Sequence, residues 1–196
     1  MRIPGGQNGY DSDGKEIVEQ LSGLPIRTRI SMALAAAVRA ASCLTEDGEA
    51  KKTVRGALDE AWHWELSGEP EALKLYQWIL PLLECELLEE IQQDIRKRNA
   101  ILSATYAMYY TIWHAARCEL RTSSANADPS LPNDLAEVSE QELTYCLNSS
   151  SESAAFPTIE RKWQLIMVSK LRDLCATQTS DMFGAAIEPA VFEESK

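Results

Sequence analysis

Histidine is the scarcest of the side chains that commonly carry catalysis or bind metals, because the 196 residues contain only His63 and His114. The five cysteines are far apart, and no two of them form a Cys-x-x-Cys pair. An odd number at wide spacing is not typical of a disulfide framework. We therefore expect five reduced thiols, at Cys43, Cys85, Cys118, Cys146 and Cys175.

The sequence also lacks a long apolar run. Its longest uninterrupted run, residues 32–38, is far too short to cross a bilayer. The first nine residues, Met-Arg-Ile-Pro-Gly-Gly-Gln-Asn-Gly, do not contain the apolar core of a signal peptide. These features predict a cytoplasmic location.

Positive charge is in deficit. The chain has 19 Lys and Arg against 30 Asp and Glu, which gives a formal net charge of −11. This balance argues against nucleic acid or an anionic membrane as a direct partner, because both require clustered cations. An acidic surface can attract a basic protein through electrostatic steering. Acidity that serves only solubility is the alternative, and the sequence leaves it open.

No stretch alternates apolar and polar residues as a strand does, whereas apolar spacings of three and four recur along the chain. We therefore predict an all-α fold, a single-domain multi-helix bundle of about six to eight helices over residues 14–176. A flexible leader over 1–13 and a weakly ordered tail over 177–196 are expected to flank it. The expected helices span residues 15–21, 26–44, 50–66, 70–80, 82–93, 94–121, 139–147 and 157–176, with polar loops at 122–133 and 149–155. Apolar positions expected to face the core include Leu73, Leu80, Ile95, Ile159 and Ile166.

One pair of residues has metal-site spacing. Glu60-Ala-Trp-His63 matches the Glu-x-x-His motif of di-iron helical bundles, in which both side chains share a helix face. Such a site needs a second copy, but His114 is preceded by Thr111 at the corresponding position. We therefore expect no metal, no cofactor and no catalytic residue, and keep a helical-bundle enzyme built around Glu60 and His63 as the less favoured alternative.

Two tryptophans in the same expected helix point in different directions. Trp62 shares an apolar stripe with Val54 and Leu58, which predicts a core position. Trp64 follows two residues later, about 200° around the helix. It is therefore either packed against a second neighbour in the core or exposed as an anchor for a partner.

Acidic residues cluster over 84–94. If residues 82–93 form one helix, Glu86, Glu90 and Asp94 lie one turn apart, with Glu84 and Glu89 beside them. One interpretation is a solvated helix face. The other is a surface that meets a cationic partner.

Residues 30–80 resemble a known family. An alanine-rich helix over Ile30 to Ser42 is followed by Ala-Leu-Asp-Glu-Ala-Trp-His-Trp-Glu-Leu at 57–66, a Ser-Gly-Glu turn and then Leu75-Tyr76. This order resembles the all-helical immunity proteins of bacterial polymorphic toxin systems, whose toxins are delivered by contact or by secretion systems. The resemblance implies that the chain binds and neutralises a cognate toxin without catalysis. It also implies that Leu58, Trp62 and Tyr76 form a structural signature, whereas toxin contacts vary from pair to pair.

We therefore expect an immunity protein that occludes the active or substrate-binding surface of a basic toxin acting in the cytosol, such as a nuclease. The candidate partner-binding residues are Trp64, Glu84, Glu86, Glu89, Glu90 and Asp94. A helical adaptor or regulatory subunit for another protein shares the same bulk properties and stays open as the alternative.

Overall fold

The computed structural model describes residues 12–45, 48–69, 71–122, 135, 138–177 and 184–193, with the backbone alone at 12–15 and 120–122. These residues form helices and no strand, which confirms the all-α prediction. No helix in these ranges is long and apolar enough to cross a membrane. The expected leader lies largely outside the described residues.

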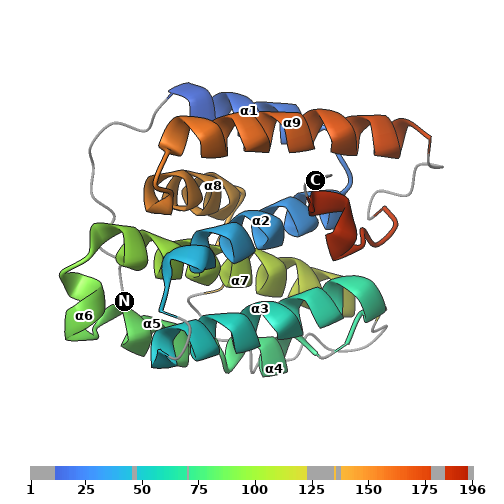
Figure 1. Cartoon of the computed structure of the whole chain (residues 1–196). Coiled ribbons are helices and arrows are strands. Elements are labelled where there is room, and N and C mark those ends of the chain that lie inside the picture. Colours follow the sequence, from blue (N-terminus) through green and yellow to red (C-terminus); the bar gives the residue numbers. More distant parts are fainter. Residues whose placement is uncertain are drawn as a thin grey trace.

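The α-helices are α1 (Ser12–Ser22), α2 (Ile26–Ala40), α3 (Glu49–Ser67), α4 (Ala72–Tyr76), α5 (Ile79–Glu86), α6 (Glu89–Gln92), α7 (Ile95–Thr122), α8 (Gln141–Ser153) and α9 (Pro157–Ala176). Two 3₁₀ turns accompany them, η1 (Ala41–Cys43) and η3 (Pro189–Phe192). In Figure 1, α1 and α9 lie side by side at the top, α2 and α8 lie below them, and α3 to α6 form the base. The long helix α7 contacts α2, α8 and each of the helices of the base.

Small side chains allow α2 to run through the centre of the bundle. Ala33, Ala36 and Ala37 are fully buried, so the neighbouring helix α8 can approach the α2 backbone closely. Ser150 donates a hydrogen bond of 3.0 Å to the Ala36 carbonyl, and the Cys146 thiol lies 3.4 Å from the Ala33 carbonyl. The predicted helix over 26–44 is shorter as an α-helix, because residues 41–43 tighten into η1.

The polar loop predicted over 149–155 is wrong for residues 149–153, which continue α8. The reason is that the serine hydroxyl groups are buried but bonded. Ser153 donates to the Ser150 carbonyl at 2.7 Å, and Ser151 accepts from the side-chain amide of Gln164 of α9 at 3.3 Å. A serine-rich helix end can therefore pack against α2 and α9 with these hydroxyl groups bonded.

The single acidic helix predicted over 82–93 is also wrong. α5 ends at Glu86, and the chain is extended at Leu88 before α6 begins as a separate short turn. The predicted helix over 70–80 is likewise two pieces, because α4 ends at Tyr76 and Pro81 lies inside the first turn of α5. Proline in the first turn of a helix loses no intrahelical hydrogen bond. Pro81 is therefore compatible with the start of α5 and does not end the preceding helix.

Residues 184–193 belong to the tail predicted over 177–196. Ile187 and Phe192 are buried against the bundle. Gly184 has φ 75°, and a Cβ atom there would lie 2.5 Å from Pro25, so only glycine allows this close approach to the start of α2. The rest of the predicted tail, apart from Thr177, lies outside the described residues.

Candidate functional site

Trp64 is not an exposed anchor in this structure. It is only 4% exposed, and the Arg27 guanidinium lies over its ring at 5.9 Å. Trp62 is also buried and contacts Phe192. Both tryptophans are covered because α3 has neighbours on two sides, Arg27 of α2 on one and residues 184–193 on the other. Of the two interpretations of Trp64, the structure shows the core position.

Two of the five candidate acids serve the fold. Glu86 is buried, and its Oε1 atom lies 3.0 Å from Nε of Arg98 in an ion pair that joins α5 to α7. Asp94 precedes α7 and accepts hydrogen bonds from the backbone N–H groups of Arg96 (3.0 Å) and Lys97 (3.4 Å). It is therefore the N-cap of α7. The predicted ridge with one-turn spacing does not form, because the chain breaks between α5 and α6.

The other three acids, Glu84, Glu89 and Glu90, are exposed. Glu89 and Glu90 line a shallow hollow of about 460 Å³, together with Glu49 at the start of α3 and Leu88. Glu84 lies on the outer side of α5. The hollow thus brings together acids of α3 and α6, two helices of the base in Figure 1.

Large leucine side chains are exposed beside these acids. Leu80 is 64% exposed and Leu87 is 75% exposed. A spacing of four places Leu80 and Glu84 on one side of α5, and Leu87, which follows the helix in a helical conformation, continues that side. Ile79 and Leu82 on the other side are buried. We call Leu80, Glu84, Leu87, Glu89 and Glu90 the acidic–leucine face. Two large apolar side chains exposed on the same side of one helix make this side a candidate interaction surface.

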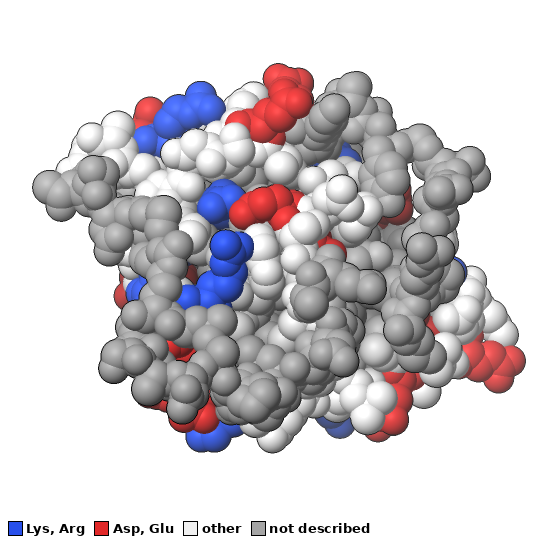
Figure 2. Space-filling model, turned by 180° about the vertical axis from the view of Figure 1, so that it is seen from behind, with Lys and Arg blue, Asp and Glu red and all other residues white. Residues whose placement is uncertain are grey.

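The leucines of this face were missed by sequence reasoning, which placed Leu80 in the core. One feature of the sequence could have indicated their exposure. The run Ile-Leu-Pro-Leu-Leu at 79–83 contains more apolar residues than one side of a helix can bury. Four other positions predicted to face the core are exposed as well: Leu73, Ile95, Ile159 and Ile166. On the rear face, Figure 2 shows acids and bases interspersed with uncharged side chains.

The Glu-x-x-His pair does not join other ligands. His63 is exposed, and the described residues contain no group of three His, Cys, Asp or Glu side chains that could hold a metal ion. His114 is buried between Tyr110 and Trp113, with ring centroids 4.6 Å away from each. Burial, together with the charges of Arg29 and Arg117, lowers the pKa of His114 to about 3.

Burial disfavours the reactive form of three of the thiols. All five cysteines are free. Burial raises the pKa of Cys146 to about 12, and it also raises the pKa values of Cys43 and Cys85. A raised pKa suppresses the thiolate, which is the reactive form of cysteine.

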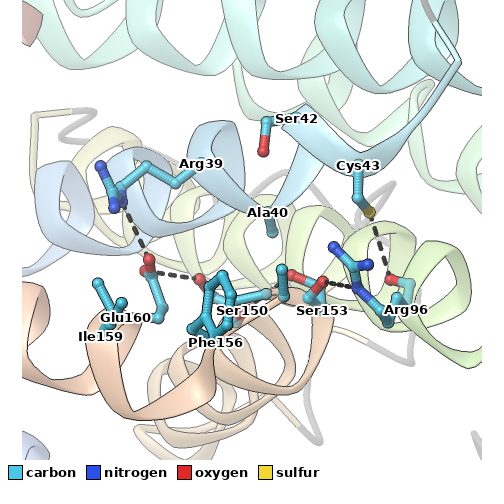
Figure 3. A pocket seen from close by; sticks show the side chains of 12 residues that line it. Arg39, Ala40, Ser42, Cys43, Arg96, Ser150, Ser153, Phe156, Ile159 and Glu160 are labelled. Carbon is cyan, nitrogen blue, oxygen red and sulfur yellow. Dashed lines mark hydrogen bonds and ion pairs between the residues drawn. The ribbon is translucent and has the colours of Figure 1, made fainter.

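A second hollow, of about 340 Å³, lies where α2, α7, α8 and α9 end or begin (Figure 3). Arg39 and Arg96 stand at its opposite ends. Nε of Arg39 donates to Glu160 at 3.0 Å, and Nε of Arg96 donates to the Ser153 carbonyl at 2.9 Å. Glu160 also accepts from Ser150 at 3.1 Å. These contacts tie helix ends together, so we assign the hollow a structural role.

Comparison with known proteins adds no relative. A scan of the chain against protein-family models found no match, and searches of curated proteins and of solved structures found none either. The chain's own residues therefore carry the functional inference. Among them, the acidic–leucine face combines the most exposed large apolar side chain, Leu87, with exposed acids.

Proposed function

We propose that this chain is an immunity protein, which binds a basic protein toxin through the acidic–leucine face and neutralises it by covering its active or substrate-binding surface. The observation that carries the proposal is the exposure of Leu80 and Leu87 close in the chain to the exposed acids at 84, 89 and 90. An apolar centre with a polar, solvent-accessible rim is the general layout of a protein-binding surface.

The acidic and the leucine side chains contribute to binding in different ways. Exposed acids at 84, 89 and 90 raise the rate at which a basic partner arrives in the right orientation. The leucines supply affinity once water has been expelled, at about 1.5–3 kcal/mol for each side chain fully buried. The net charge of −11 extends the same attraction over the whole molecule.

The support for a toxin as the partner is the resemblance of residues 30–80 to immunity proteins. Leu58 and Trp62 are buried, and Tyr76 is partly buried against the core. These are positions suited to a structural signature. Such a signature leaves the contact surface free to vary with the toxin. The acidic–leucine face contains none of the three signature residues.

The face is also suited to rigid occlusion. Ile79 and Leu82 of α5 and Ile91 of α6 are buried, and both helices contact α7. The backbone of packed helices is already ordered, so binding a partner does not require ordering a loop. A preorganised surface of this kind can block a toxin without any catalytic step.

The proposal is tested by recovering the chain from its native host and identifying the protein bound to it. We expect a basic protein that arrests growth when it is expressed alone and is harmless when this chain is co-expressed. A bound protein that is harmless by itself would contradict the immunity role and favour the adaptor alternative.

A further inference from the structure

Residues 184–193 lie across the bundle and are held by three helices. The Phe192 ring lies 6.0 Å from the Trp62 ring of α3, and Lys170 of α9 donates a hydrogen bond of 2.6 Å to the Val191 carbonyl. η3 also contacts α2. In Figure 1 this red segment stands between α9 and α3, in front of α2. It has little regular structure of its own, so these contacts determine whether it stays in place.

A carboxyl group lies beneath this segment. Glu65 of α3 is fully buried, with 0% of its surface exposed. Its Oε1 atom accepts hydrogen bonds from the Ser31 hydroxyl at 2.9 Å and from the Ile187 backbone N–H at 3.3 Å. Its Oε2 atom has no hydrogen-bond partner among the described residues. Glu65 therefore links α3 directly to the segment while half of its carboxyl group is unsatisfied.

Few charges compensate an ionised Glu65. From α2, Nε of Arg27 lies 4.0 Å from Oε2, too far for a hydrogen bond. From the covering segment, Glu188 and Glu193 are exposed, and from α9 the Lys170 ammonium is bonded to Val191. A buried carboxylate with so little compensation destabilises the structure that buries it.

We propose that residues 184–193 are a proton-sensitive cover, docked over Glu65 when its carboxyl group is protonated and released when that group ionises. Release lets water reach the carboxylate and exposes the Trp62 ring. This inference is independent of the proposed toxin-binding function, because it concerns α2, α3 and the 184–193 segment and not the acidic–leucine face.

The direction of the pH effect follows from the pKa of Glu65. Burial raises it from 4.5 to about 7 against the opposing effects of Ser31, Arg27 and the Ile187 N–H group. The covered state therefore keeps a proton that the uncovered state loses near pH 4.5. Docking is strongest below that pH and weakens as the pH rises to about 7, above which both states are ionised and no further change is expected.

Hydrogen exchange of the Ile187 amide tests the proposal, with each rate divided by the intrinsic rate at the same pH. Linkage between pKa values of about 7 and 4.5 predicts that protection falls by about thirtyfold between pH 5.5 and pH 8. Glu65→Gln should keep high protection at both values. Glu60→Gln, a change of the same chemistry on the same helix, should retain the fall.

Two further measurements distinguish local release of residues 184–193 from other causes of faster exchange. Amides of the core helix α7, such as that of Tyr110, should not show the thirtyfold fall, which separates local release from global unfolding. Phe192→Ala should lower Ile187 protection at both pH values while preserving the ratio between them. The proposal is overturned if the wild-type ratio is flat, or if Glu65→Gln shows the wild-type fall.

Discussion

At the scale of single residues, two buried titratable side chains give the stability opposite dependences on pH. Glu65 has a raised pKa, so its contribution to the free energy of unfolding declines as the pH rises from about 4.5 to 7. His114 has a lowered pKa of about 3, so the unfolded chain binds a proton that the folded chain refuses. The contribution of His114 to the free energy of unfolding is present above about pH 6.5 and is lost as the pH falls towards 3. Together they place the greatest stability in mildly acidic solution.

His114→Phe should make the fold less sensitive to acid, because phenylalanine keeps a ring between Tyr110 and Trp113 and takes up no proton. For a pKa change from 6.5 to about 3, the free energy of unfolding lost between pH 7 and pH 4.5 should shrink by about 2.5 kcal/mol. Urea denaturation at the two pH values measures the loss. His63→Gln, at an exposed position of α3, should leave it unchanged. An equal loss in wild type and His114→Phe would show that His114 does not control acid sensitivity.

Trp62→Ala and Trp64→Ala should both lower the free energy of unfolding, by about 3–5 kcal/mol each, because both indole rings are buried. Equilibrium denaturation provides the measurement. His63→Ala, at the exposed position between them, should cost less than about 0.5 kcal/mol. If Trp64→Ala kept full stability but lost partner binding, the buried position of Trp64 would be wrong and the anchor interpretation correct.

At the scale of elements, spacing predicted helices well and their ends poorly. The stripe of Val54, Leu58 and Trp62 correctly predicted α3, and Gly68 ends it in the left-handed conformation with φ 82°. The end of α8 was missed because serine favours loops unless its hydroxyl group finds a buried acceptor, and for Ser150 that acceptor is on α2, more than a hundred residues away. A contact so distant in the chain leaves no periodic signal.

Neutralising the exposed acids of α5 and α6 should slow association with a basic partner. We expect Glu84→Gln, Glu89→Gln and Glu90→Gln together to reduce the association rate by about tenfold at low salt and to flatten its salt dependence. Stopped-flow mixing at two salt concentrations measures both effects. Glutamine at Glu16, Glu19 and Glu188, exposed acids outside the face, changes the net charge equally and is the matched control.

Equal slowing by both triple variants would show that net charge alone steers the partner and that the face has no special role. Glu86→Gln and Asp94→Asn, in contrast, should act on stability, because the first breaks the ion pair to Arg98 and the second weakens the α7 cap. The five candidate acids are therefore expected to fall into two groups, those that affect the association rate and those that affect stability.

At the scale of the whole molecule, the sequence predicted the acidic part of the candidate site but not its apolar part. Glu84, Glu89 and Glu90 were expected at a surface and are exposed there. Leu80 was wrongly expected in the core and Leu87 was not assigned, because a short helix with leucines on both sides has two possible inner faces until its packing partner is known. The 184–193 cover was missed for a similar reason, since its burial depends on side chains of α2, α3 and α9.

The dissociation constant of the recovered partner for a Leu80→Ser, Leu87→Ser double variant tests whether the partner binds at the acidic–leucine face. Both side chains are mostly exposed, so the fold should be unaffected, whereas the loss of two apolar contacts should weaken binding by about a hundredfold, or about 3 kcal/mol. Phe156→Ser with Ile159→Ser, two exposed apolar residues elsewhere, is the matched control and should bind as wild type does. Calorimetric titration that gives the Leu80, Leu87 variant wild-type affinity would contradict the acidic–leucine face as the binding surface.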